Sequence, residues 1–310
     1  MSLNVLFSAR RDMWDEYRAP LDKAFVSAGL SIDLHKELAP ELVDYIAYAP
    51  DGPVSDFSDF ARLKAVLGLW AGVEGVVGNA TLTVPMTRLV DSGLTEGMVE
   101  WVTGHVLRYH LGMDAQMSGQ DGIWTQVIPP LARNRRVGFL GLGELGSACA
   151  RALVALNFRV SGWSRSSKTI EGVTCLSGDT GLVTLLQGAE ILVLLLPLTP
   201  FTENLLNAER LALLPRAAFL LNPGRGALID DQALLAALNT GQIAHATLDV
   251  FRTEPLPSGH PYWSHPNVTV TPHIASDTRA ETAALVIAEN IRRNEAGEPM
   301  QFVVDRAAGY

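Results

Sequence analysis

The stretch RVGFLGLGELG, residues 136–146, decides the fold. Its first part, Arg136–Leu140, is a short run of mostly apolar residues, which predicts a buried strand. The three glycines that follow match the pattern G-x-G-x-x-G, which joins a strand to a helix in dinucleotide-binding folds. The pattern alone is weak, so its value here comes from the strand before it and from the helical apolar spacing after it.

Each glycine has a separate purpose in such a turn. Gly141 permits the tight turn, Gly143 lets the backbone approach a pyrophosphate, and Gly146 lets the helix pack close to the strand. Glu144 and Leu145 lie at the amino end of the helix, where backbone amides and the helix dipole favour a phosphate. We therefore predict that these five residues bind a dinucleotide; the alternative is a glycine-rich turn in an unrelated α/β fold.

Further candidate strands follow the glycine turn, with helical stretches between them. They are Arg159–Trp163, Ile191–Leu196, Ala217–Leu221, Ala244–Val250 and Val268–Thr271. The second of them is apolar throughout, which is typical of a strand that is covered on both faces. Asp231–Asn239 is a predicted helix, with Gly241 just beyond its end. Strands joined by helical crossovers predict a Rossmann-type doubly wound parallel sheet.

The first third of the chain also alternates strands with helical segments. The candidate strands are Asn4–Ser8, Ser31–His35, Tyr45–Tyr48, Ala65–Leu69 and Met86–Val90, and helices are expected at Ala19–Ala28, from Thr95 toward Met117 and at Asp277–Glu295. We expect the last helix to pack back on the first third. This predicts a smaller, flavodoxin-like α/β substrate-binding domain of residues 1–95 and 274–310, and a dinucleotide-binding domain of residues 96–273.

Composition excludes several classes of protein. The net charge of -9 and the pI of about 5.3 disfavour binding to a phosphate backbone, so we expect no nucleic-acid partner. The first residues resemble no signal peptide, and no apolar run reaches transmembrane length, so we expect a cytoplasmic protein with no membrane partner. Cys149 and Cys175 suggest neither a disulfide framework nor a metal site.

The end of the second strand of the larger domain indicates which dinucleotide is bound. NAD sites place a carboxylate there to hold the ribose 2′-hydroxyl, but no Asp or Glu occurs from residue 145 to residue 170. The expected place holds Trp163, Ser164, Arg165 and Ser166. A guanidinium and two hydroxyls suit a 2′-phosphate, so NADP is favoured over the alternative of a solvated surface arginine.

Three polar residues follow ends of the predicted strands, where open α/β sheets bind ligands. Arg225 lies in NPGRG (222–226), Glu254 follows LDVF (248–251), and His273 lies in TPHIAS (271–276). An arginine can hold a carboxylate, a histidine can give a proton near neutral pH, and a glutamate can orient that histidine and favour its charged form. Taken singly, each could be structural; together they predict a catalytic site for reduction of a 2-oxo acid.

These motifs, in this order, resemble the D-2-hydroxyacid dehydrogenases along essentially the whole chain. Within that family the chain is most similar to the bacterial glyoxylate/hydroxypyruvate reductase A group, on the marks Leu67–Val73, Trp163–Ser166, Thr271–Ala275 and the terminal VDR…GY, residues 304–310. The resemblance implies that Arg225, Glu254 and His273 are the catalytic residues. It also implies a homodimer, with the helix around residues 95–117 at its interface.

The resemblance also implies binding residues. Asp249 matches a residue near the nicotinamide carboxamide, and Leu196, Pro197 and Thr202 lie in a segment that lines the cofactor. Ala71 and Gly72 match a loop whose amides hold the substrate carboxylate, and Trp70 precedes that loop, where it closes the pocket or belongs to the core.

The expected reaction is the NADPH-dependent reduction of glyoxylate or hydroxypyruvate by hydride transfer, with His273 as the proton donor. One alternative keeps the chemistry and changes the substrate to a bulkier 2-oxo acid such as phenylpyruvate. The other is a non-enzymatic NAD(P)-sensing protein that resembles the corepressors with this fold.

Overall fold

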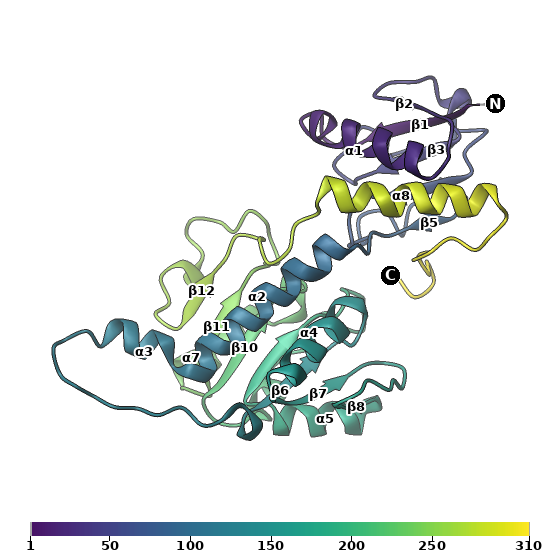
Figure 1. The fold of residues 1–310 in the computed structure, drawn as a ribbon. Helices are drawn as coiled ribbons and strands as arrows, with labels where there is room; N and C mark the ends of the chain where they lie inside the picture. Colours follow the sequence, from purple (N-terminus) through teal and green to yellow (C-terminus); the bar gives the residue numbers. More distant parts are fainter. Residues whose placement is uncertain (1, 310) are drawn as a thin grey trace. The chain divides into compact units, whose positions relative to one another are not determined.

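The computed structural model describes residues 2–309, which form two compact units. The smaller unit holds the residues up to Leu94 together with those from Asp277 onward, and the larger unit holds Thr95–Ser276. Both units are built around parallel sheets (Figure 1). Within residues 2–309, no helix is both long enough and apolar enough to cross a membrane.

The larger unit contains a seven-stranded parallel sheet in the order β12-β11-β10-β9-β6-β7-β8. The strands are β6 (Arg136–Leu140), β7 (Arg159–Trp163), β8 (Val173–Leu176), β9 (Ile191–Leu194), β10 (Ala218–Asn222), β11 (Ile243–Leu248) and β12 (Val268–Val270). The strand order reverses between β6 and β9, so the predicted Rossmann-type doubly wound sheet is confirmed. β8 was not predicted from the sequence, because this edge strand is short and only partly buried.

Helices cover both faces of this sheet, as Figure 1 shows. The helices of this unit are α2 (Ser92–Leu111), α3 (Met113–Ser118), α4 (Glu144–Ala155), α5 (Gly178–Gly188), α6 (Ala208–Ala212) and α7 (Asp231–Asn239), of which α3 has no buried residue and covers neither face. Apolar residues of α2 and α4 form one core with β6 and β9, and α5, α6 and α7 form another with the opposite face of the sheet. The side chains of β9 are buried, as its unbroken apolar run predicted.

One expectation about the helices is wrong. The helix that was expected to run from Thr95 toward Met117 is two helices, α2 and α3. Gly112 separates them in the left-handed conformation with φ 65°, which glycine adopts without the steric cost of a side chain. The prediction for α7 was right in both bounds, and Gly241 follows it with φ 69° and donates to the carbonyl of Leu238.

The smaller unit contains a five-stranded parallel sheet in the order β2-β1-β3-β4-β5. Its strands are β1 (Leu3–Ser8), β2 (Ile32–His35), β3 (Tyr45–Tyr48), β4 (Ala65–Gly68) and β5 (Met86–Thr87). This order is the flavodoxin-like one, as predicted. The helices α1 (Met13–Ser27) and α8 (Ala280–Glu295) share one core with the sheet, and loops cover its other face.

Three boundaries in this unit differ by more than one residue from the expected ones. α1 begins six residues earlier than Ala19 and contains Pro20. The helix continues through this proline because its apolar side chains pack in the core of the unit. α8 begins at Ala280 rather than Asp277. The strand expected to reach Val90 ends at Thr87.

Candidate active site

The glycine turn after β6 has the geometry that a pyrophosphate needs. Gly141 has φ 108°, and a Cβ there would overlap the carbonyl of Leu195; a Cβ on Gly146 would overlap the carbonyl of Gly141. These two glycines are therefore required by close packing between strand and helix. Gly143, at the exposed amino end of α4, is different, because a Cβ there would meet nothing within 4 Å. The backbone at Gly143 is thus open to a ligand that approaches the helix terminus.

The turn after β7 carries the residues predicted to recognise the 2′-phosphate. Arg165 and Ser166 are exposed, whereas Ser164 is buried and its hydroxyl donates to the carbonyl of Ser166 at 2.8 Å. The indole nitrogen of Trp163 donates to the carbonyl of Gly178 at 2.9 Å. Ser164 and Trp163 therefore shape the turn, and Arg165 and Ser166 present their side chains on its surface.

The hydroxyl of Thr202 fixes the turn that follows β9. It donates to the carbonyl of Pro197 at 2.7 Å and accepts from the amide of Thr199 at 2.8 Å. Leu196 is buried beside these residues. Thr202 thus holds the turn in shape, and a direct contact of this hydroxyl with a cofactor stays a prediction.

His273 and Glu254 form a hydrogen-bonded pair. Nδ1 of His273 lies 2.7 Å from Oε2 of Glu254, and because a carboxylate has no proton to give, the ring nitrogen is the donor. The other carboxylate oxygen, Oε1, accepts the amide of Phe251 at 2.7 Å. The His273 side chain is 55% exposed, so the pair is accessible to a ligand. The carboxylate holds the ring by one nitrogen and leaves Nε2 for proton transfer.

Asp249, at the end of β11, anchors the segment that carries His273. This residue is fully buried, and Oδ1 accepts the hydroxyl of Thr271 at 2.6 Å and the amide of Ile274 at 2.9 Å. Oδ2 accepts the amide of Ala275 at 2.9 Å, and the carbonyl accepts the amide of His273 itself. These bonds hold His273 at φ 55°, a left-handed conformation that is rare for a residue with a side chain. The nicotinamide contact of Asp249 stays a prediction.

The turn after β10 positions Arg225. Oδ1 of Asn222 accepts the amide of Gly224 at 3.2 Å, and Nδ2 donates to the carbonyl of Arg225 at 2.9 Å. The half-buried Arg225 donates to the carbonyl of Gly224 at 2.7 Å. A Cβ on Gly226 would overlap the backbone of Phe251, so this turn packs directly against the loop that holds Glu254. The structure therefore brings the loops of Arg225, Glu254 and His273 together.

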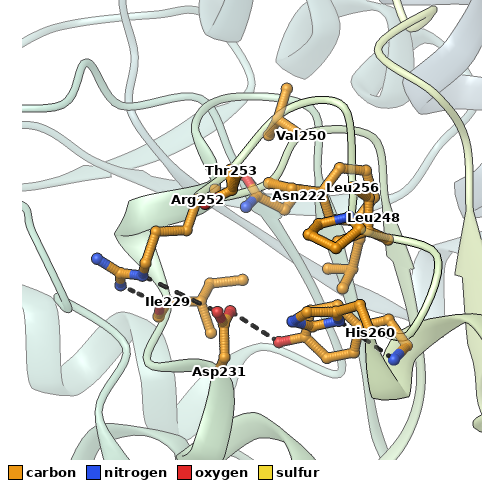
Figure 2. Close-up of a pocket in the computed structure, with 13 residues that line it drawn as sticks. Asn222, Ile229, Asp231, Leu248, Val250, Arg252, Thr253, Leu256 and His260 are labelled. Atoms are coloured by element: carbon orange, nitrogen blue, oxygen red, sulfur yellow. Dashed lines mark hydrogen bonds and ion pairs between the residues drawn. The ribbon is translucent and has the colours of Figure 1, made fainter.

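Arg252 links the loop of Glu254 to two other parts of the larger unit, and it was not predicted from the sequence. Figure 2 shows its guanidinium near Ile229 and Asp231, at the side of a cavity of about 100 Å³. It donates to the carbonyl of Ile229 at 3.0 Å and to Oδ1 of Asn204 at 2.5 Å. Asp231 in turn accepts the hydroxyl of Tyr262 at 2.9 Å. No local pattern predicts Arg252, because its partners lie on loops that are distant in the sequence.

The loop that was predicted to hold a substrate carboxylate lies in the smaller unit. Trp70 is 37% exposed, so of its two predicted roles the core one is excluded. Ala71 and Gly72 are half-buried. Within residues 2–309, their amide nitrogens donate no hydrogen bond to the chain. Two adjacent amides without an internal acceptor suit an anionic oxygen.

The doubly wound sheet, the glycine turn and the histidine–glutamate pair define a dinucleotide-dependent dehydrogenase. The family model described as D-isomer specific 2-hydroxyacid dehydrogenase, NAD binding domain, matches residues 104–275. The chain belongs to the D-2-hydroxyacid dehydrogenase family.

Two relatives and two solved structures show which members of the family the chain is similar to. Glyoxylate/hydroxypyruvate reductases A from Yersinia enterocolitica and Serratia proteamaculans are 42% and 43% identical over 257 residues, which is 80% of this chain and 82% of each relative. A D-isomer specific 2-hydroxyacid dehydrogenase from Xanthobacter autotrophicus Py2, solved with NADPH and MES, is 44% identical with a TM-score of 0.93 over the full length of both chains. The NADPH-dependent glyoxylate/hydroxypyruvate reductase from Sinorhizobium meliloti, solved with NADP and sulfate, is 34% identical with a TM-score of 0.89, again over both full lengths. The predicted similarity to the reductase A group is confirmed.

Proposed function

We propose that the protein reduces small 2-oxo acids with NADPH, taking glyoxylate to glycolate and hydroxypyruvate to D-glycerate. The observation that carries the proposal is the 2.7 Å pair of His273 and Glu254 on a dinucleotide-binding sheet. The carboxylate fixes the ring through Nδ1, which leaves Nε2 to give a proton to a developing alkoxide. The names of the similar reductases support the substrate class.

The residues divide the work as follows. When bound, NADPH supplies the hydride that adds to the carbonyl carbon of the substrate. His273 gives a proton from Nε2 to the carbonyl oxygen, and Glu254 keeps the ring oriented. Arg225 binds the substrate carboxylate, because a guanidinium forms strong bonds with the two oxygens of a carboxylate. It also polarises the ketone. In the smaller unit, the proposed substrate-binding groups are the amides of Ala71 and Gly72 and the side chain of Trp70.

The proposed cofactor site follows the carboxyl ends of β6 and β7. Gly141, Gly143 and Gly146, with Glu144 and Leu145, form the pyrophosphate turn, and its open face at Gly143 fits that group. Arg165 and Ser166 present a cation and a hydroxyl where a 2′-phosphate would lie, on a turn shaped by Trp163 and Ser164. Leu196, Pro197, Thr202 and Asp249 complete the wall near the nicotinamide. Neighbours crystallised with NADPH or NADP support the preference for the phosphorylated cofactor.

The proposal includes a homodimer. Large apolar side chains gather on the segment that includes α3 and the chain after it, which Figure 1 shows extending away from the sheet of the larger unit. They are Leu111, Met113, Met117, Ile123, Trp124, Val127, Ile128 and Leu131, and Trp124 is 95% exposed. An apolar segment of this size is typical of a surface that a second chain covers.

Three further expectations stay predictions. They are the substrate-binding role of residues 1–95 and 274–310, the dinucleotide-binding role of residues 96–273, and the cytoplasmic location.

The test is an absorbance assay of NADPH oxidation with a panel of 2-oxo acids. We expect turnover with glyoxylate and hydroxypyruvate. Faster turnover with phenylpyruvate would move the proposal to the bulkier substrate. Tight NADPH binding without turnover of any member of the panel would contradict the proposal and favour the sensor alternative.

A further inference from the structure

The loop between β4 and β5, residues 69–85, carries the two proposed carboxylate-binding amides but has little regular structure of its own. A single turn follows Gly72, in which the amides of Val76 and Val77 both donate to the carbonyl of Val73, at 3.0 and 2.9 Å. Val73, Val76 and Leu82 are buried in the apolar core on the loop-covered face of the sheet. Apolar packing holds one side of this loop, and several of its carbonyls bond a residue from outside the loop.

The C-terminal tail supplies that residue. The amide of Val304 donates to the carbonyl of Met86 at 2.8 Å, and the amide of Arg88 donates to the carbonyl of Phe302 at 3.0 Å. Thr87 and Val303 form an antiparallel bridge, so the tail runs beside β5 in a defined register. This places the next residues of the tail against the β4–β5 loop.

Arg306 gathers three carbonyls of that loop with one guanidinium. Nε donates to the carbonyl of Val77 at 3.1 Å, NH2 donates to that of Asn79 at 2.6 Å, and NH1 donates to that of Leu82. Arginine suits this task because its planar group carries five donors in a rigid arrangement. Asp305 keeps the tail turned in place, since Oδ1 accepts the amides of Ala307 and Ala308 at 3.0 Å.

We propose that Arg306 is a positioning residue for substrate binding, which acts through the β4–β5 loop. The path is short: Arg306 bonds the carbonyl of Val77, the amide of Val77 bonds the carbonyl of Val73, and Val73 directly follows Gly72. Arg306 therefore holds the far end of the turn whose near end carries the proposed amides. This inference rests on the proposed function, because it assigns those amides to the carboxylate of the 2-oxo acid.

The test compares Arg306→Ala and Arg306→Lys with the control Arg293→Ala. Arg293 is a matched arginine of the same unit, whose partners are Glu289 at 2.8 Å and the carbonyl of Pro299 at 3.2 Å. We expect Arg306→Ala to raise the KM for glyoxylate about tenfold while the KM for NADPH changes less than about twofold. Lysine keeps the charge and part of the bonding, so Arg306→Lys should lie between wild type and Arg306→Ala. The control should match wild type.

Hydrogen exchange of residues 70–82 supplies a readout that does not depend on turnover. Exchange should be faster in Arg306→Ala than in wild type or in the control. Unchanged exchange would overturn the inference, and so would faster exchange with an unchanged KM for glyoxylate. If Arg306→Ala does not fold, Arg306→Lys decides by the same two measurements. An inactive wild type would instead contradict the proposed function, which separates the two failures.

Discussion

His273 depends on separate residues for its orientation and for its place in the chain. Glu254 holds the ring through Nδ1, and buried Asp249 holds the backbone on both sides through the amides of residues 273–275. A rare left-handed φ at His273 is kept because these bonds outweigh its steric cost. Because different residues do these two tasks, a mutation that removes only the ring tests the proposed proton donor without removing the bonds that hold the backbone.

Replacing His273 by alanine should cut turnover of glyoxylate by roughly two to four decades, because the alkoxide loses its proton donor. NADPH binding, measured by quenching of protein fluorescence, should stay near the wild-type value. His35→Ala, a histidine of the smaller unit that bonds Asn4, serves as the control and should keep full activity. Near-normal turnover of His273→Ala would remove this histidine from the mechanism.

Arg165 tests the cofactor preference. Without its guanidinium, a 2′-phosphate loses a charge-assisted bond, so Arg165→Ala should raise the KM for NADPH about tenfold or more. The KM for NADH should stay unchanged, since NADH carries no such phosphate. Arg151→Ala removes an exposed arginine of α4 and should change neither value. Equal effects on both cofactors would contradict the assignment.

The element proposed to position the dinucleotide is the β6–α4 turn, whose conformation depends on close approach of its backbone. Gly146→Ala would push a methyl group into the carbonyl of Gly141, and we expect it to destabilise the protein by about 1–3 kcal/mol. Gly188→Ala at the end of α5 meets open space and should be neutral or stabilising, because alanine is the better helix former. Urea denaturation of both variants measures the difference. Equal stability would show that the turn tolerates expansion.

Packing around β11 predicts a dependence of stability on pH. Burial, together with the positive charge of Arg108, lowers the pKa of His245 to about 4, although Asp114 opposes the shift. Between this value and the unfolded pKa of about 6.5, only the unfolded chain binds the proton. The free energy of unfolding should therefore fall as the pH is lowered from about 6.5 to about 4. His245→Gln should flatten this part of the curve in urea titrations; an unchanged slope would assign it to other groups.

At the scale of the whole molecule, the apolar segment of residues 111–131 predicts association. Trp124→Asp combined with Ile128→Asp should weaken the dimer, because charges at a buried interface are costly. Sedimentation velocity should then show a mass closer to that of one chain. Val26→Asp, at a side chain of α1 that is 78% exposed, is the control and should leave the mass unchanged. A wild type that sediments as one chain would contradict the dimer itself.

Local patterns in the sequence determined much of this protein. The glycine spacing at 141–146, the apolar run at 191–196 and the absence of a carboxylate from 145 to 170 depend only on neighbouring residues. They predicted the doubly wound sheet and a site for NADP. Strand ends also predicted Arg225, Glu254 and His273, because parallel strands bring their carboxyl ends to one edge.

Long-range contacts were decided only by the tertiary structure. Asp249 binds the His273 segment from 25 residues away, Arg252 reaches Asn204 across 48 residues, and Arg306 reaches Val77 across 229. Each bond depends on where the chain returns after several elements, and no local propensity encodes that return. The edge strand β8 was not predicted either, because its four residues carry only a weak strand pattern. Its pairing with β7 is seen only in the folded sheet.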